Sequence, residues 1–169
     1  MAIIKTSNTT GKYHDQNSYN SAINYITRPD KTPHHYIGSI GLDMYNPVGS
    51  MESVAIHFGQ KHGVHVRQFL LAFDPNESIN PEIANLIGQS IIFYLGNRFQ
   101  AIYAVHEDEP HIHIHIVINA VSYVDGTKYR GTHKVFRRFM DFVKRVLRQY
   151  GINQLIYVPT SKDTESPQG

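Results

Sequence analysis

Cysteine is absent from this sequence of 169 residues. Without it there is no disulfide framework and no thiolate ligand, so a bound metal ion would have to be held by His, Asp or Glu side chains. The sequence also lacks the run of about eighteen apolar residues that a membrane-spanning helix needs. Its first residues, MAIIKTSNTTGK, have neither the long apolar core nor the small-residue cleavage site of a signal peptide. We therefore expect a cytoplasmic protein with no membrane insertion.

The composition is otherwise that of an ordinary globular domain. Hydrophobic residues make up 41% of the chain and charged residues 18%, and the length is sufficient for one domain with its own core. We expect this domain at residues 1–158, followed by a polar tail or the start of a linker at 159–169. The formal charge of +2 is compatible with a nucleic-acid partner but does not require one. The unusual feature is the content of 11 histidines.

Hydrophobic periodicity and turn residues predict a mixture of strands and helices. Strands are expected at 2–6, 36–40, 64–74, 99–106, 111–123 and 154–158. Helices are expected at 18–28, 50–63, 80–96 and 133–151, with N-caps at Ser50 and Asn80 and glycines at the C-terminal ends, Gly96 and Gly151. Two long helices packed on about four or five strands joined by short loops predict an α+β fold, with a largely antiparallel central sheet flanked by helices.

One segment, HEDEPHIHIHIVINA at residues 106–120, concentrates histidines and acids beside an apolar strand. Alternate residues of a strand share a face, so His111, His113 and His115 are expected on one face and the isoleucines between them on the other. The first face would carry polar chemistry and the second would pack in the core. His106 ends the preceding strand, and the short EDEP link folds it back beside the histidine strand, which makes it a candidate third ligand.

A metal site competes here with a solvated hairpin face that tolerates imidazoles and binds nothing. Three alternating histidines, His106 and two flanking carboxylates favour the metal site. The residues leave the identity of the metal open. Three imidazoles favour zinc or copper by affinity, whereas neighbouring carboxylates and an exchangeable position suit magnesium or manganese.

The same segment resembles a motif of the relaxase and mobilisation nuclease family, in the MobP-like branch of the HUH endonucleases. That motif reads H-x-D-x-x-H-x-H-x-H followed by an apolar strand and Asn, and HEDEPHIHIHIVIN keeps every spacing. The segment SAINYITRPDKT is similar to the motif that carries the family's nucleophilic tyrosine, here Tyr25. Ala72 stands where the family usually has Ser. The resemblance covers roughly residues 1–152 and implies a palm-type sandwich.

This resemblance implies an enzyme that nicks one strand of plasmid or integrative-element DNA at the transfer origin, for conjugative mobilisation. The tyrosine would attack the scissile phosphate and leave a 5′-phosphotyrosine and a free 3′-OH, with a divalent metal ion polarising the phosphate. Magnesium or manganese is expected in function, with zinc or another transition metal as the alternative. The implied partners are single-stranded origin-of-transfer DNA, accessory mobilisation proteins and a coupling protein.

The resemblance also assigns roles residue by residue. The metal ligands would be His106, His113 and His115, and the catalytic set Tyr25, Asp108, Glu109 and His111. Asp108 would orient a ligand imidazole through its second nitrogen, and Glu109 could do the same or touch the ion. His111 would support the ligands or contact substrate. No residue is identified as the general base for the tyrosine.

Tyr25 has competitors among the 11 tyrosines of the sequence. Tyr19 lies on the same expected helix, and Tyr13 is a more distant candidate. A tyrosine on an amphipathic helix is usually half-buried packing, so the resemblance is what singles out Tyr25.

Cationic and aromatic residues outside the histidine segment are candidates for DNA contact. They are Arg28, Lys31, Lys128, Tyr129, Arg130 and Lys134. The helix at 133–151 carries six Lys and Arg against one acid, Asp141. For each of these the alternative is an ordinary solvated surface. His34 and His35 are interpreted as loop surface or as a further DNA contact.

Two other classes of function remain open from the sequence. One is a relaxase-like module that binds origin DNA with little cleavage. The other is a three-histidine hydrolase that acts through a metal-bound water and needs no tyrosine. Loss of cleavage on replacing Tyr25 by Phe would separate the nuclease from the hydrolase.

Overall fold

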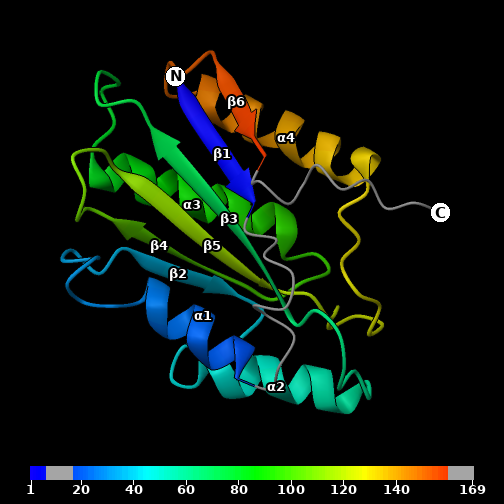
Figure 1. The fold of residues 1–169 in the computed structure, drawn as a ribbon. Coiled ribbons are helices and arrows are strands. Elements are labelled where there is room, and N and C mark those ends of the chain that lie inside the picture. The colour runs from blue at the N-terminus through cyan, green and yellow to red at the C-terminus, as the bar shows by residue number, and fades with distance from the viewer. Residues whose placement is uncertain (7–16, 160–169) are drawn as a thin grey trace.

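A computed structural model describes residues 1–6 and 17–159 of the chain. Within these residues one six-stranded sheet has the strand order β2-β4-β5-β3-β1-β6 (Figure 1). The strands are β1 (Ala2–Thr6), β2 (Ile37–Ile40), β3 (Val66–Phe73), β4 (Ala101–His106), β5 (His113–Asn119) and β6 (Leu155–Val158). Neighbouring strands pair antiparallel except β1 and β6, which are parallel. The expected α+β fold with a largely antiparallel sheet is confirmed, and the two short strands expected at 36–40 and 154–158 form the edges of the six-stranded sheet.

Two layers of helices enclose the sheet. The helices are α1 (Ser18–Ile26), α2 (Pro47–His57), α3 (Pro81–Leu95) and α4 (His133–Arg148). The larger core cluster lies between the sheet and α3 and α4, and includes the isoleucines of β5. The smaller one joins α1 and α2 to β3, β4 and β5 through residues such as Ile23, Met51 and Val117. No helix among the described residues is long and apolar enough to cross a membrane.

The structure confirms most of the expected helix signals and corrects the second helix, which ends at His57 rather than at residue 63 and also begins earlier than expected. Asn80 accepts from the Ile83 amide at 2.8 Å and begins α3. Gly151 has a φ of 80° after α4, a conformation that glycine adopts without a steric penalty. The expectation that Ser50 caps the second helix is wrong: Asn46 caps α2 and Pro47 begins it. Pro is favoured at the first helical position, where no intrahelical N–H bond is lost, and this signal outranks Ser50.

The β4–β5 hairpin carries the histidine motif, and its register places His106 directly opposite His113. Both faces of β5 are buried along its whole length. The expectation of a polar face opposed to a core face is therefore wrong at Val117, which lies in the core cluster beneath α1 and α2. His113, His115 and Asn119 keep that face polar on either side of Val117.

Candidate metal centre and active site

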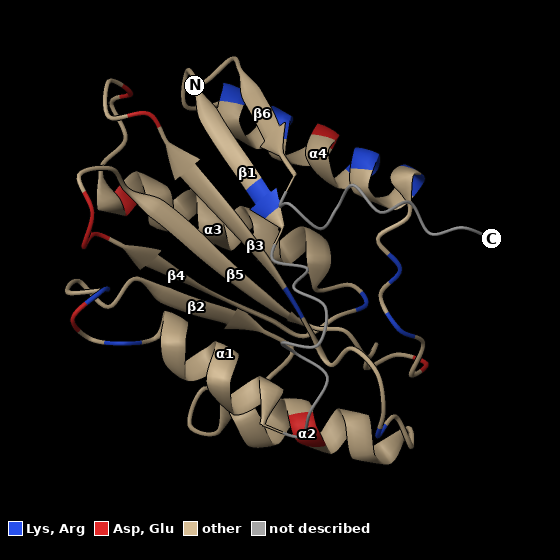
Figure 2. Cartoon of the chain, viewed as in Figure 1, with Lys and Arg blue, Asp and Glu red and all other residues tan. Residues whose placement is uncertain are grey.

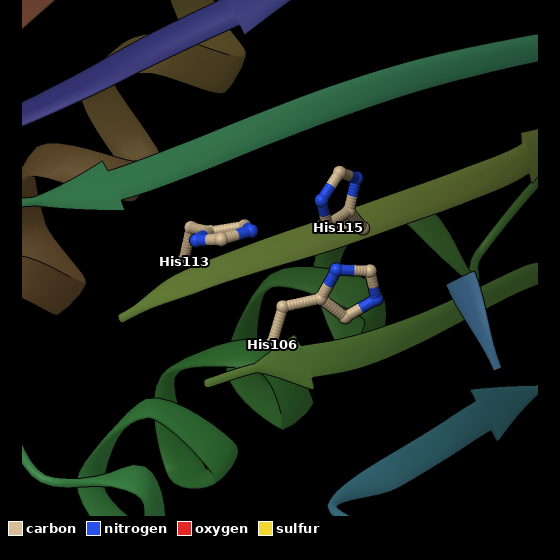
Figure 3. Close-up of side chains that lie close together, drawn as sticks. All are labelled: His106, His113 and His115. Carbon is tan, nitrogen blue, oxygen red and sulfur yellow. The ribbon is translucent and has the colours of Figure 1, made fainter. Parts of the chain in front are cut away.

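Three imidazoles meet at the end of the β4–β5 hairpin (Figure 3). The ring centroids of His106 and His115 are 4.1 Å apart, those of His113 and His115 5.1 Å, and those of His106 and His113 5.3 Å. One nitrogen of each ring lies within 4.8 Å of the others. The three side chains are at most 7% exposed. The hairpin therefore brings together the three residues that the sequence singled out as ligands.

His106 is locked in one tautomer by the backbone of α1. Its Nε2 is 2.8 Å from the carbonyl oxygen of Ile26. A carbonyl only accepts, so Nε2 carries the proton and Nδ1 holds the lone pair. Nδ1 is buried and has no hydrogen-bond partner among the described residues. A buried acceptor with no donor, aimed at two further imidazoles, fits a bound cation.

The other two ligands are held in different ways. Nδ1 of His113 lies 3.3 Å from the carbonyl oxygen of His111, which leaves Nε2 of His113 for an ion. Nδ1 of His115 lies 3.2 Å from the amide nitrogen of Gln68 on β3. The hydrogen-bonding surroundings of all three rings are thus defined by the fold.

The site favours neutral imidazoles, which is the form that binds metals. Burial, reinforced by the neighbouring rings of His106 and His113, lowers the pKa of His115 to about 2. Burial is also the main reason why the pKa of His106 is lowered. His106 and His115 are held neutral in the pH range of the cell, so neither has to lose its charge before an ion binds.

Asp108 lies beside two of the imidazoles and is paired with Lys31. Its Oδ1 is 4.0 Å from His106 Nδ1 and 3.9 Å from His113 Nε2. Its Oδ2 accepts from the Lys31 ammonium at 2.6 Å, and this hydrogen bond lowers the pKa of Asp108 and raises that of Lys31. The carboxylate therefore stays charged next to the candidate metal centre.

Tyr25 lies beside the cluster on α1. Its ring centroid is 5.7 Å from that of His115 and 6.1 Å from that of His106, and the side chain is 46% exposed. The Lys31 ammonium lies 5.6 Å from the Tyr25 ring centroid. A phenol, a cation and three imidazoles thus lie close together, and the phenol is open to solvent.

The competing tyrosines do not share this position. Tyr19 is 2% exposed, and its hydroxyl donates to Asn119 Oδ1 at 2.8 Å. Burial raises the pKa of Tyr19, which opposes its use as a nucleophile. Tyr13 lies outside the described residues.

A second set of ligand-type side chains overlaps the first. Nε2 of His111 is 3.4 Å from Glu109 Oε2, and these two side chains with His113 form a group of three whose ligand atoms lie within 4.8 Å. His113 Nδ1 already faces a backbone carbonyl, so the only lone pair that His113 can offer is on Nε2. Both groups of ligand-type side chains would need that lone pair. The two sets therefore compete for His113.

The expected DNA contacts are only partly at the surface. Arg28 is exposed but paired with Asp30 through two hydrogen bonds of 3.1 and 2.8 Å. The Lys128 ammonium donates to the carbonyl oxygens of His62 and Val64, and so serves the loop before β3. Arg130 and Lys134 are exposed. Figure 2 shows Lys and Arg spaced along α4 and in the segment leading to it.

The expectation of an exposed, base-stacking Tyr129 is wrong. This side chain is 8% exposed and packs against Phe69 and Phe99, with ring centroids at 6.3 and 5.4 Å. Burial raises the pKa of Tyr129 to about 12. The cationic flanks suggested a solvated loop, but the large aromatic ring gains more by joining the core beneath α4.

Two groups at the site escaped the sequence reasoning. Gln68 belongs to a strand that could be predicted, but its contact with His115 depends on the β3–β5 register. The Ile26 carbonyl has no side-chain signal at all. The same register puts Ala72 directly opposite His113, so the position where the resembling family usually has Ser adjoins a candidate ligand.

The fold is α+β, and its candidate site brings three buried imidazoles together beside an accessible tyrosine. The family model of the relaxase nuclease domain, MobA/VirD2-like, matches residues 25–152, and the chain belongs to this family. The suspected relationship is thereby confirmed.

The relatives by sequence bear relaxase names or the name rlx. Protein rlx of Staphylococcus aureus is 26% identical over 157 residues, which are 90% of this chain and 45% of the relative. A second protein rlx from the same species is 26% identical over 125 residues, 74% of this chain and 36% of the relative. The group II intron-interrupted relaxase LtrB of Lactococcus lactis subsp. cremoris is 32% identical over 59 residues, 34% of this chain and 10% of the relative. The chain thus spans less than half the length of the curated relatives it matches.

Proposed function

We propose that this chain is a DNA relaxase that nicks one strand at the transfer origin of a plasmid or integrative element, for conjugative mobilisation. Membership of the relaxase nuclease family supports DNA nicking as the general activity. The observation that carries the finer proposal is the position of Tyr25, whose ring lies 5.7 Å from His115 and 6.1 Å from His106.

In this proposal a divalent ion is held by His106, His113 and His115. The three buried imidazoles and the Nδ1 of His106, which has no hydrogen-bond partner among the described residues, are the features that fit it. When bound, the ion would polarise the scissile phosphate and neutralise charge on its nonbridging oxygens. We expect magnesium or manganese, because Asp108 and Glu109 add the oxygen ligands that these ions prefer.

The covalent step belongs to Tyr25. Its phenolic oxygen attacks phosphorus, the new bond joins tyrosine to the 5′ side of the nick, and the bond to the 3′ oxygen breaks. The leaving oxygen takes up a proton and becomes a free 3′-OH. The exposed edge of Tyr25 lets its proton pass to solvent, and Lys31, 5.6 Å from the ring, places a positive charge near the anionic phosphate.

The hydrolase alternative uses the same imidazoles with water as the nucleophile. The accessible tyrosine beside the cluster favours transesterification over it. Accessory mobilisation proteins and a coupling protein remain proposed partners, as does single-stranded origin DNA as the substrate.

The test is incubation with end-labelled single-stranded oligonucleotides spanning the transfer origin of the parent element, with Mn²⁺ or EDTA, on a denaturing gel. We expect a shifted protein–DNA band that depends on metal and disappears in both Tyr25→Phe and His113→Ala. Tyr45→Phe is the matched control, because Tyr45 is fully exposed at 101% and belongs to the loop before α2. Cleavage that survives Tyr25→Phe would move the nucleophile to water if no protein–DNA band forms, or to another tyrosine such as Tyr19 if the band remains. Binding without cleavage under any metal would leave a DNA-binding module.

A further inference from the structure

Gln68 is the one side chain of β3 whose polar end contacts a candidate ligand in the described residues. It is 7% exposed, and its amide nitrogen lies 3.2 Å from His115 Nδ1. In this arrangement an amide N–H donates to Nδ1, so the single proton of the neutral imidazole sits on Nε2. Neither ring nitrogen of His115 then presents a lone pair to an ion.

The other two ligands do not have this difficulty. His106 and His113 each place one ring nitrogen against a backbone carbonyl, which can only accept a hydrogen bond. Their tautomers are therefore set, and the opposite nitrogen is always available. His115 faces an amide, and an amide offers a donor on one side and an acceptor on the other.

If the side-chain amide of Gln68 rotates by half a turn, its oxygen takes the place of its nitrogen next to His115 Nδ1. The oxygen then accepts from Nδ1–H of His115, and Nε2 gains the lone pair. We propose that Gln68 is a positioning residue that sets the tautomer of His115, with its nitrogen toward the ring in the metal-free chain and its oxygen toward the ring when an ion is bound. This inference rests on the proposed metal centre and deepens it.

The direct test is a long-range ¹H–¹⁵N spectrum of the histidine rings in the full chain. With EDTA we expect His115 to carry its proton on Nε2. With Zn²⁺, a diamagnetic probe, we expect the proton on Nδ1 and a metal-shifted Nε2. The same His115 tautomer in both samples would overturn the proposal.

Two substitutions test the role of Gln68 through metal affinity. Gln68→Glu offers acceptors only, so the Nδ1–H tautomer should appear without metal and Mn²⁺ should bind at least as tightly as to the wild type. Gln68→Leu offers no partner, and its Mn²⁺ affinity by calorimetry should fall about tenfold or more, as for other groups that orient ligands. If Gln68→Glu keeps the Mn²⁺ affinity that Gln68→Leu loses, Gln68 acts by orienting His115 and not only by packing.

Gln100→Leu is the matched control. Gln100 is also buried, at 4% exposure, and bonds Gly41, Ser50 and Asn119 rather than a candidate ligand. We expect this variant to be less stable than the wild type but to bind Mn²⁺ within twofold of it.

The outcomes separate the two proposals. If the wild type binds neither zinc nor manganese, the metal centre itself fails, and the role of Gln68 fails with it. If the wild type binds and a folded Gln68→Leu binds equally well, only the inference about Gln68 fails. If Gln68→Leu does not fold, the metal-free His115 tautomer can still be compared between the wild type and Gln68→Glu. Identical His115 spectra in the two proteins would overturn the inference.

Discussion

His115 makes the stability of the metal-free chain depend on pH. In the folded chain the pKa of His115 falls to about 2 from the ordinary value of 6.5, so between these values the unfolded chain binds one more proton than the folded one. Stability is therefore complete above pH 6.5 and is lost as the pH falls, by up to about 1.4 kcal/mol per pH unit for one such group.

Urea unfolding with EDTA at pH 7 and at pH 5.5 measures this effect. We expect the drop between the two pH values to shrink in His115→Asn and to remain in His35→Asn, which alters an exposed loop position. Equal drops in the wild type and both variants would show that His115 is not the group responsible.

Asp108 permits a prediction about the charge beside the ligands. Its carboxylate is within 4.0 Å of both His106 and His113, so Asp108→Asn should weaken Mn²⁺ binding about tenfold. Asp30→Asn is the control, since Asp30 also pairs with a cation, Arg28, but at the exposed surface. Calorimetry in matched buffers gives both affinities, and similar losses in the two variants would argue for a general charge effect.

For single residues, the sequence predicted positions correctly where a local rule of strand or hairpin geometry applies. The period of two along 111–115 and the short EDEP link predicted that His106 lies beside a face shared by His111, His113 and His115, and the family resemblance selected His106, His113 and His115 as the ligands. The contacts of Gln68 and of the Ile26 carbonyl could not be predicted, because they depend on strand register and on where α1 docks. Tyr129 was misplaced because charged neighbours in sequence do not determine which way a ring turns.

Among the elements, α1 is the one that brings the proposed nucleophile, Tyr25, to the sheet. Near its first turn Tyr19 bonds Asn119 at the end of β5, and at its last turn the Ile26 carbonyl bonds His106 at the end of β4. These two buried hydrogen bonds hold both ends of the helix along the hairpin. Tyr25, one residue before Ile26, is thereby held over the imidazoles.

The packing of α3 on β4 gives a prediction at the scale of elements. A Cβ on Gly88 would lie 2.6 Å from the Tyr103 ring, which is fully buried. Gly88→Ala should therefore destabilise the chain by about 1–3 kcal/mol, despite the better helix propensity of alanine. Ser90→Ala is the control and should be neutral or slightly stabilising, because Ser90 is only half-buried and its hydroxyl donates to the Leu86 carbonyl of its own helix.

Thermal unfolding of both variants measures the difference. An unchanged midpoint for Gly88→Ala would mean that α3 can move away from β4 at no cost. The existence of these elements was predictable from periodicity and caps, but their close approach was not, since it depends on which helix covers which strand. At Ser50 the error arose because the sequence offers two possible starts for this helix, and the start at Pro47 prevailed.

At the scale of the whole molecule, the two helical layers differ in how much of the sheet they cover. The core beneath α1 and α2 includes residues of β3, β4 and β5 but none of β1 or β6. Paired residues share a face, so the ladder His113, Ala72, Ile3, Ile156 continues from the candidate metal centre across this side of the sheet. Ile156 is 37% exposed. The described structure thus leaves a partly apolar path leading away from Tyr25.

Lys5 belongs to the neighbouring ladder, in register with Leu70 and through it with His115. It is exposed, and it lies two strands from the metal centre, or about 10 Å at the usual strand spacing. A single strand of DNA that reaches Tyr25 along this face would pass Lys5. The basic surface of α4 lies on the opposite layer, where the same strand would not meet it.

Lys5→Ala should therefore weaken binding of single-stranded origin DNA and reduce the slope of log K against log salt by about 0.7, the contribution of one phosphate contact. Arg148→Ala removes an exposed cation of α4 and should leave that slope unchanged. Fluorescence anisotropy from low to moderate salt measures both. A reduced slope in Arg148→Ala with no change in Lys5→Ala would instead place the DNA on α4, and the open half of the sheet would then need another role.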